Sequence, residues 1–263
     1  MKKQRPFLDT FLISLKSLLF FVVYYFVCAF VSALIDMIDD LAGKTVPSSL
    51  VGITAYTIVI LAFLITFKAL GSSLFKEATI SLVKPRYIIS GALFGFGYFG
   101  FYQIMAFVLQ KIPAQWTQWL INQQNEMASS QLDGNILIAV IYLCIFAPIC
   151  EEIVFRGLML TTLKGVIPKW GAIVACALCF GVMHAPSIIA MVVTFGFGIL
   201  LGFIFWRTNS LIPCILAHIL LNSANFLLFI PLNIGLYVVM IASIPAIIFS
   251  IILIARREKN ENI

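Results

Sequence analysis

The sequence has very little charge and almost no histidine. Of its 263 residues only 11% are charged and two are histidine, whereas 62% are hydrophobic. A soluble globular domain carries roughly 25% charged residues and about half apolar residues, so this composition excludes a soluble enzyme and a disordered chain. The 17 Lys and Arg are spread along the chain at the ends of apolar runs, which excludes the basic stripe of a nucleic-acid-binding protein.

The positions of the cysteines do not indicate a disulfide framework. The six cysteines all lie inside or beside apolar segments, where a free thiol packs as a small hydrophobic group. Cys176 and Cys179 form a C-x-x-C pair, but no second pair accompanies them, so we interpret the two as neighbours on one packed helix face. A disulfide-stapled secreted module is therefore excluded.

Long apolar runs fill most of the chain and predict an all-α, polytopic membrane protein. A helix needs about 20 mainly apolar residues to cross a hydrocarbon layer ~30 Å thick. We expect about eight transmembrane helices, forming a single transmembrane domain over residues 1–263 with the site inside the helical bundle. The runs are 18–35, 50–67, 87–109, 136–150, 170–183, 188–206, 211–230 and 234–255.

The positions of Lys and Arg predict the orientation. Fifteen of the 17 lie near the two ends of the chain or in alternate connections, and only Lys44 and Lys111 lie in the others. Cytoplasmic connections carry the excess of Lys and Arg, so we expect both termini to be cytoplasmic. His218 lies about three helical turns, roughly 15 Å, from the cytoplasmic Arg207, which predicts a site in the cytoplasmic half of the membrane.

Two further features have simple membrane interpretations. Gly95, Gly97 and Gly100 spell G-x-G-x-x-G, but the dinucleotide fingerprint needs a preceding strand, and here an apolar run surrounds it. We expect these glycines to allow close contacts between membrane helices. The polar connection over residues 111–135 contains Trp116 and Trp119, which predicts an interfacial segment with aromatic anchors.

Three polar clusters interrupt the apolar runs in the second half of the chain. A charged residue at the centre of a membrane helix costs roughly 2.5–3.5 kcal/mol on insertion scales. A purely structural purpose would therefore be expensive, and we take the cluster residues as candidates for function. They are Glu151, Glu152 and Arg156 in the first cluster, His184 in the second, and His218 and Asn222 in the third.

Helical spacing separates the two adjacent glutamates. Arg156 is four positions after Glu152 and shares its helix face, but it lies about 140° around the helix from Glu151. We therefore expect a Glu152–Arg156 ion pair, and a Glu151 that faces elsewhere and suits a general base or acid.

The third cluster also places two side chains on one face. His218 and Asn222 are four residues apart and present two neutral hydrogen-bond donors towards one point. This pair suits an oxyanion better than a metal ion, because an Asn amide is a poor zinc ligand beside available His and Cys.

The order of the clusters resembles the CAAX protease and bacteriocin-processing family, also called CPBP or Abi, whose best-known branch is the prenyl-protein endopeptidase Rce1. The motifs are Glu-Glu-x-x-x-Arg, Phe-x-x-x-His and His-x-x-x-Asn on successive apolar runs. Pro148 before the first motif and Arg207-Thr208 before the third also match. The resemblance covers a core over residues 136–230.

The resemblance implies an intramembrane endopeptidase of the glutamate type. Glu151 would be the general base that activates a water, and His184 would hold or share that water. His218 and Asn222 would form the oxyanion hole, with Glu152 and Arg156 as the supporting ion pair. Hydrolysis would need no acyl-enzyme and no required cofactor.

The resemblance also implies the partners and the setting. The partners would be the lipid bilayer and a membrane-embedded or lipid-anchored peptide or protein substrate, with no nucleic acid. The compact chain resembles the bacterial branch, whose members are linked to bacteriocin maturation and immunity, peptide pheromones and surface-protein display. We therefore expect a bacterial plasma membrane protein.

Two alternatives stay open at this point. A metal-dependent version of the same enzyme would use Glu151, His184 and His218 as ligands of a divalent ion such as zinc, although the chain contains no His-Glu-x-x-His motif. The second alternative is a non-catalytic protein. It would be a bacteriocin-immunity protein that acts by binding, or a small transporter that uses its intramembrane polar residues as a proton relay.

Overall fold

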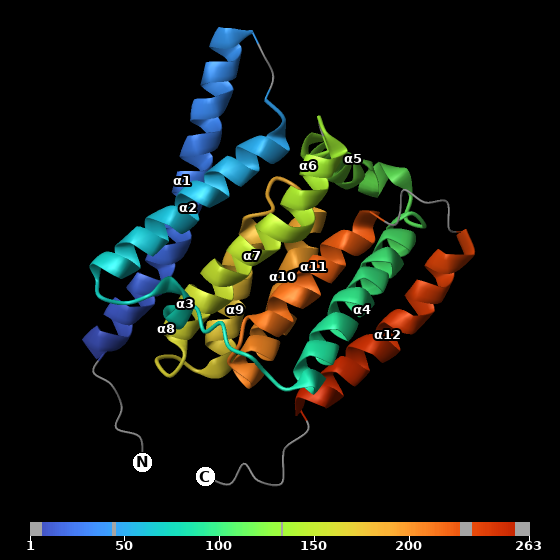
Figure 1. Cartoon of the computed structure of the whole chain (residues 1–263). Coiled ribbons are helices and arrows are strands. Elements are labelled where there is room, and N and C mark those ends of the chain that lie inside the picture. Colours follow the sequence, from blue (N-terminus) through green and yellow to red (C-terminus); the bar gives the residue numbers. More distant parts are fainter. Residues whose placement is uncertain (1–6, 44–45, 133, 227–232, 256–263) are drawn as a thin grey trace. The chain divides into compact units, whose positions relative to one another are not determined.

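The protein is an all-α, polytopic membrane protein. Its computed structural model describes residues 7–43, 46–132, 134–226 and 233–255, and no strand occurs among them. The long helices are α1 (Phe7–Ala42), α2 (Ser48–Ala69), α4 (Pro85–Leu109), α5 (Ala114–Gln131), α10 (Ile188–Thr208) and α12 (Asn233–Ala255). The shorter helices are α3 (Leu74–Glu77), α9 (Lys169–Val182) and α11 (Ile212–Phe226) (Figure 1).

One further long helix, called the composite helix below, runs over Ile136–Leu163. Its successive parts are α6 (Ile136–Ile141), η1 (Tyr142–Phe146), α7 (Ala147–Glu152), η2 (Ile153–Leu160) and α8 (Thr161–Leu163). In η1 and η2 the backbone is π-helical.

The expected number of eight spans is not confirmed. Within the described residues, six helices are long and apolar enough to cross a membrane, namely α1, α2, α4, α10, α12 and the composite helix. The helices α9 and α11 are apolar but have only 14 and 15 residues. In α9 the reason lies in the sequence, because Pro168 precedes the helix and Pro186 follows it, and proline does not continue a helix.

Some expectations concern residues outside those that the structure describes. The expected run 211–230 extends into 227–232, and six of the basic residues near the two ends of the chain lie at 1–6 and 256–263. Lys44 lies outside the described residues as well.

The backbone contacts divide the chain into two compact units. The first unit comprises Met1–Ile80 and Trp119–Gly202, and the second comprises Ser81–Gln118 and Phe203–Ile263. The expectation of one transmembrane domain stays a prediction.

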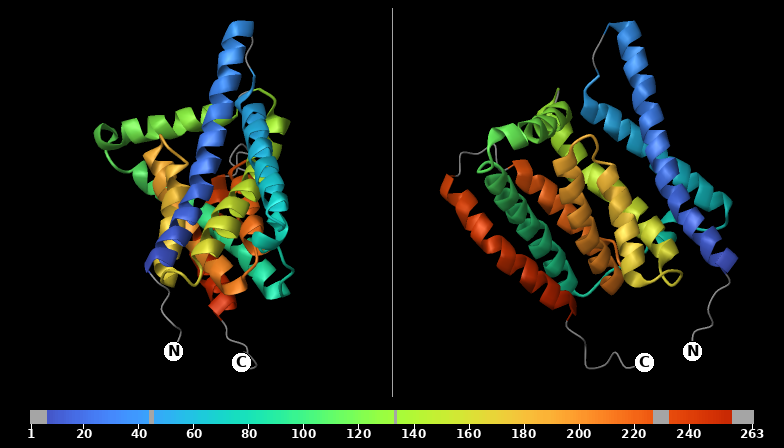
Figure 2. Two further views of the ribbon diagram at one scale, coloured as in Figure 1. Left: turned by 90° about the vertical axis from the view of Figure 1, so that its left-hand side faces the viewer. Right: turned by 180° about the vertical axis from the view of Figure 1, so that it is seen from behind.

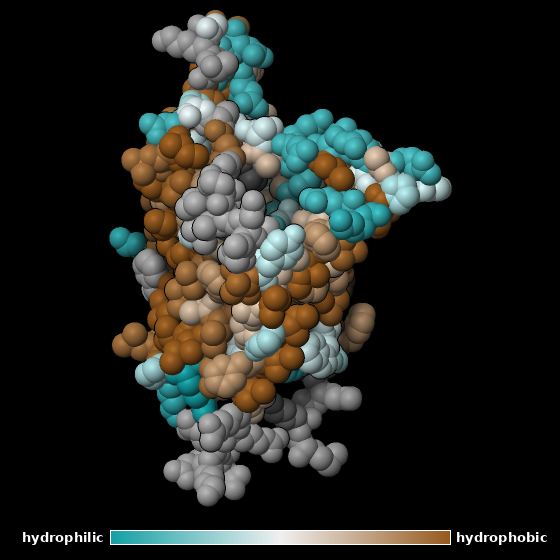
Figure 3. Space-filling view, turned by 90° about the vertical axis from the view of Figure 1, so that its right-hand side faces the viewer, coloured by the Kyte–Doolittle hydropathy of each residue, from teal (hydrophilic) through white to brown (hydrophobic). Residues whose placement is uncertain are grey.

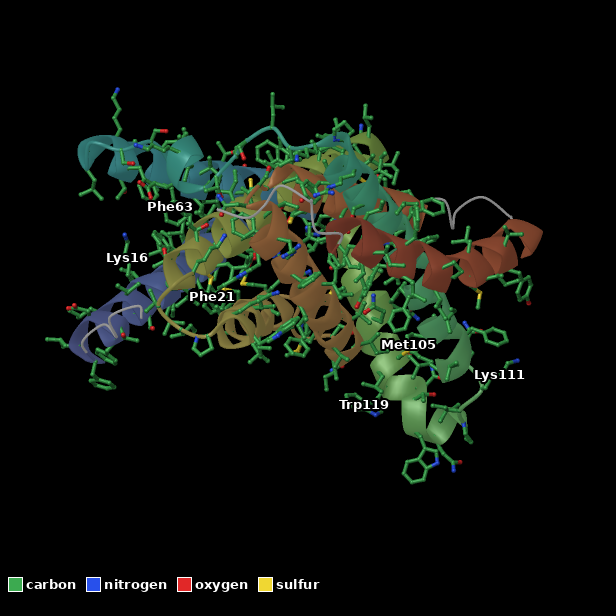
Figure 4. All side chains as sticks on the ribbon, turned by 90° about the horizontal axis from the view of Figure 1, so that it is seen from below. Lys16, Phe21, Phe63, Met105, Lys111 and Trp119 are labelled. Atoms are coloured by element: carbon green, nitrogen blue, oxygen red, sulfur yellow. The ribbon has the colours of Figure 1, made fainter. Side chains whose placement is uncertain are left out.

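In the first unit, α1 packs against α2 and the composite helix. Aromatic rings fill the contact between α1 and α2: Phe20 lies 5.9 Å from Phe63 and 6.2 Å from Phe67, between ring centroids. Phe21 on α1 contacts Phe155 of η2. Phe21 and Phe63 are labelled in Figure 4. The two N-terminal helices thus stand beside the segment that carries Glu151 and Glu152.

In the second unit, α4 lies between α11 and α12 and packs against both (Figure 2, right). Glycines make this close approach possible. A Cβ at Gly95 would overlap the backbone carbonyl oxygen of Ala217 on α11, and one at Gly100 would lie 2.6 Å from Cβ of Ser243 on α12. The structure confirms that the glycines of the G-x-G-x-x-G segment serve helix packing.

Gly95→Ala is expected to destabilise the protein by about 1–3 kcal/mol, because the added methyl group must push α11 away from α4. The measurement is thermal unfolding of the purified protein in detergent micelles. Gly171→Ala is the matched control, since a Cβ there would meet only Ile167 Cδ1 at 3.9 Å. Equal unfolding temperatures for the two variants would contradict the packing account.

Large apolar side chains cover the outer surfaces of the spans. In α12 they include Val238, Ile241 and Ile252, which are 59%, 77% and 53% exposed. Figure 3 shows apolar residues gathered on this side of the molecule and hydrophilic residues gathered over α5. Trp116 and Trp119 of α5 are 68% and 51% exposed, and the interfacial location of this helix stays a prediction.

Candidate active site

The two adjacent glutamates lie on a short α-helical piece between two π-helical segments. The N–H of Ala147 donates to the carbonyl of Tyr142, and the N–H of Thr161 donates to that of Arg156, five residues back in each case. Pro148 explains the first departure, because it offers no N–H to the carbonyl four residues before it. Single π-helical turns occur often at functional sites. Here they flank Glu151 and Glu152.

Glu152 and Arg156 form a buried ion pair. Nη1 of Arg156 donates to Oε1 of Glu152 at 2.7 Å, and the two side chains are 1% and 0% exposed. Nη2 of Arg156 also donates to the carbonyl of Gly198 at 3.3 Å. The guanidinium lies 4.5 Å from the centroid of the Phe180 ring, where a cation–π interaction adds to the pairing. The pair forms as the i, i+4 spacing predicts.

Glu151 has a different partner from its neighbour. The hydroxyl of Tyr56, on α2, donates to Oε1 of Glu151 at 2.7 Å. Both side chains are only 8% exposed. Sequence reasoning did not identify Tyr56, which lies 95 residues away from Glu151 in the chain. The structure thus places the two glutamates in separate surroundings, one against an arginine and the other against a tyrosine.

His184 lies in the turn that follows α9, half-buried. Its Nδ1 lies 3.0 Å from the carbonyl oxygen of Phe180. Because a carbonyl can only accept, Nδ1 of His184 is the donor in this contact. The ring also packs on the edge of the Phe180 ring, at 5.1 Å between centroids. Phe180 therefore contacts His184 through both its carbonyl and its ring, and these two contacts orient the imidazole.

A chain of aromatic rings connects the surroundings of Glu151 with those of His184. Successive centroids in this chain lie 5.7, 5.6, 5.8, 5.2 and 5.1 Å apart. All members belong to the first unit. In order, the rings are those of Tyr142, Tyr56, Tyr24, Phe155, Phe180 and His184. Phe180 connects several of these groups, because its ring contacts Phe155, Arg156 and His184.

The turn that carries His184 is also tied to α5. Ser187 is fully buried, and its hydroxyl donates to Oε1 of Gln124 at 2.8 Å. The same hydroxyl oxygen accepts from the N–H of Ala190 at 3.2 Å, at the start of α10. Neither Gln124 nor Ser187 carried a signal in the sequence, because polar residues are common in connections.

The third cluster lies in the second unit, on α11. His218 is 4% exposed and Asn222, one turn later, is half-buried. The start of α11 is fixed by Ser210, whose hydroxyl donates to the carbonyl of Ser81 at 2.6 Å and accepts from the N–H of Ile212 at 3.3 Å. The two side chains expected to form an oxyanion hole thus share one face of a short, well-anchored helix.

Within the described part of the first unit, no three His, Cys, Asp or Glu side chains form a group that could hold a metal ion. The metal-dependent alternative draws one of its three ligands, His218, from the second unit.

One comparison with known proteins gives a match. Residues 133–224 match the family model described as type II CAAX prenyl endopeptidase Rce1-like. No curated protein and no solved structure matches the chain. The matched segment contains every candidate residue from Glu151 to Asn222, whereas Tyr56 and Tyr24 lie outside it. The family model is one of CAAX endopeptidases, and within this polytopic membrane protein the segment over residues 133–224 is similar to it.

Proposed function

We propose that this protein is a glutamate-type intramembrane endopeptidase that cleaves a membrane-embedded or lipid-anchored peptide or protein. One observation carries the proposal: Glu151 is a buried carboxyl group that accepts a hydrogen bond from a tyrosine hydroxyl on another helix. Arg156 pairs with Glu152, and Glu151 instead accepts a hydrogen bond from Tyr56. A buried carboxyl group positioned by a hydroxyl donor suits proton transfer, and Glu151 lies in a segment that matches an endopeptidase family.

In the proposed mechanism Glu151 takes a proton from a water molecule, and the oxygen of that water attacks the scissile carbonyl carbon. His184 accepts the second proton of that water in a hydrogen bond through Nε2, which aligns the oxygen lone pair. Collapse of the tetrahedral intermediate breaks the C–N bond, and Glu151 returns its proton to the leaving amine. The products are a carboxylic acid and an amine, and no acyl-enzyme forms.

His218 and Asn222 are proposed to stabilise the oxyanion of that intermediate. Both are neutral donors one turn apart on α11, and the anchoring of this helix supports a preorganised pair. Such donors act most strongly in a site that excludes water, which agrees with the burial of His218.

Asn222→Ala is expected to lower kcat by about 10²- to 10³-fold, the usual cost of removing one oxyanion donor. Asn225→Ala is the matched control on the same helix, because Asn225 only donates to the carbonyl of Leu221 within α11. The measurement is steady-state cleavage of a quenched fluorescent peptide by the purified variants. Equal losses in the two variants would contradict the oxyanion-hole assignment.

The mechanism uses no metal ion, and both termini and the site are proposed to face the cytoplasm of a bacterial cell. Glu152 and Arg156 are proposed as supports that hold α7 and η2 in place. A metal-dependent enzyme using Glu151, His184 and His218 would lose its activity under exhaustive chelation, whereas the proposed enzyme would retain it.

The function itself is tested by comparing the membrane peptidomes of cells that carry the wild-type protein or Glu151→Gln. The expected result is a set of peptides, all ending at one type of cleavage site, that occur only with the wild-type protein. The same comparison names the substrate. Identical peptidomes from cells with equal amounts of the two proteins would overturn the proposal.

A further inference from the structure

We infer that Tyr56 is a positioning residue for Glu151, held in place by a tyrosine cluster, and that the N-terminal helices thereby complete the active site. The tyrosine cluster consists of Tyr24 on α1, Tyr56 on α2 and Tyr142 on η1. The inference rests on the proposed function, because it concerns the general base of that mechanism. It goes beyond the family match, since Tyr24 and Tyr56 lie outside residues 133–224.

The first support is the contact itself. The Tyr56 hydroxyl donates to Glu151 Oε1 at 2.7 Å, with both groups buried. A hydrogen bond to an ionised acceptor is about twice as strong as one between neutral groups, and low polarity around it adds to its strength. The carboxyl group of a glutamate can rotate about its Cγ–Cδ bond, and a hydrogen bond to Oε1 fixes that rotation. Tyr56 therefore sets the direction in which the carboxyl group faces a water.

The second support is that the Tyr56 ring is held from both sides. Its centroid lies 5.6 Å from that of Tyr24 and 5.7 Å from that of Tyr142. Tyr24 is fully buried and stands edge-on to Phe155 at 5.8 Å, directly before Arg156 in the chain. The Tyr56 ring thus packs against α1 through Tyr24 and against η1 through Tyr142. Through Tyr24 and Phe155 it is also connected to η2.

The third support is a glycine in α2 that leaves room for the Tyr142 ring. Gly52 lies one helical turn before Tyr56, and a Cβ at this position would overlap the Tyr142 ring at Cζ and Oη. Only glycine leaves room for Tyr142 to reach α2 and pack against Tyr56. A cluster that only filled space could use apolar side chains of many shapes, whereas this one brings a hydroxyl to the carboxyl group of Glu151.

The test compares Tyr56→Phe with Tyr25→Phe in the full-length purified protein. Tyr25 neighbours Tyr24 in the chain, is 42% exposed, and its ring contacts are Phe21 and Phe26, so it is the matched control. The probe is a quenched fluorescent farnesylated CAAX peptide in lipid vesicles. We expect Tyr56→Phe to lower kcat by about 10- to 100-fold, the equivalent of one charged hydrogen bond, with KM changed less than twofold. Tyr25→Phe should match the wild type.

A second readout does not depend on activity. The infrared difference between wild type and Glu151→Gln isolates the carboxyl band of Glu151. This band should shift in the Tyr56→Phe background and stay in place in the Tyr25→Phe background, because Tyr56 donates to that carboxyl group and the ring of Tyr25 contacts Phe21 and Phe26 instead. A packing role alone would move the unfolding temperature and leave both the band and the kcat-to-KM pattern unchanged.

The two readouts separate the possible failures. A shifted band in a protein that cleaves no peptide would overturn the proposed function and keep Tyr56 as the partner of Glu151. An active enzyme whose kcat and carboxyl band are unaffected by Tyr56→Phe would overturn the positioning role and keep the proposed function. A drop in kcat together with a shifted band is the result expected.

Discussion

Glu151→Gln is expected to lower kcat by about 10²- to 10⁴-fold, the range that general acid–base catalysis contributes. Glutamine has nearly the same shape and keeps an oxygen that can accept the Tyr56 hydroxyl, so the fold should be retained. It cannot take a proton from water at neutral pH. The loss should therefore appear in kcat while the unfolding temperature stays close to that of the wild type.

Glu126→Gln is the control for this substitution, because Glu126 is an exposed glutamate on α5. Its activity should equal that of the wild type. Activity is measured on the purified protein in vesicles, and folding by thermal unfolding and by elution as a single species. A Glu151→Gln protein that folds and turns over at the wild-type rate would remove Glu151 from the mechanism.

Arg156→Gln is expected to destabilise the protein by about 3–5 kcal/mol, the cost of breaking a buried ion pair from one side. The substitution leaves the carboxylate of Glu152 at 0% exposure without its cation. It also removes the hydrogen bond to Gly198 and the contact with the Phe180 ring. Thermal unfolding in micelles and the yield of folded protein from membranes measure the effect.

Two variants sharpen this second prediction. Arg207→Gln is the matched control, because Arg207 is exposed and its side chain only donates weakly, at 3.4 Å, to the carbonyl of Ile254. The double variant Glu152→Gln with Arg156→Gln should recover part of the stability, since it no longer buries an uncompensated charge. If Arg156→Gln unfolds at the same temperature as Arg207→Gln, the pair does not support the site.

Local spacing predicted the parts of this protein that depend on local geometry. The Glu152–Arg156 pair follows from four-residue spacing on a helix, and the packing role of Gly95 follows from small residues in an apolar run. Pro148 also carried a local signal, because a missing N–H disturbs helical bonding. The position of this proline did not predict the π-helical segment over Ile153–Leu160.

The partner of Glu151 could not be predicted in this way. Tyr56 lies in a run without charged residues, where a tyrosine is an ordinary membrane residue. The packing of α2 against the composite helix brings it to Glu151. The contact between Ser187 and Gln124 has the same origin. The number of spans is not settled by apolar content alone, because α9 and α11 are apolar but have only 14 and 15 residues.

The most direct test of the central claim is cleavage of a farnesylated CAAX peptide by the purified protein in vesicles, after exhaustive removal of divalent metal ions, with the products identified by mass spectrometry. The account predicts that the wild-type protein cuts the peptide at one internal bond and that Glu151→Gln, equally folded, does not. Equal cleavage by the two proteins, or cleavage that returns only when a divalent metal is added, would contradict it.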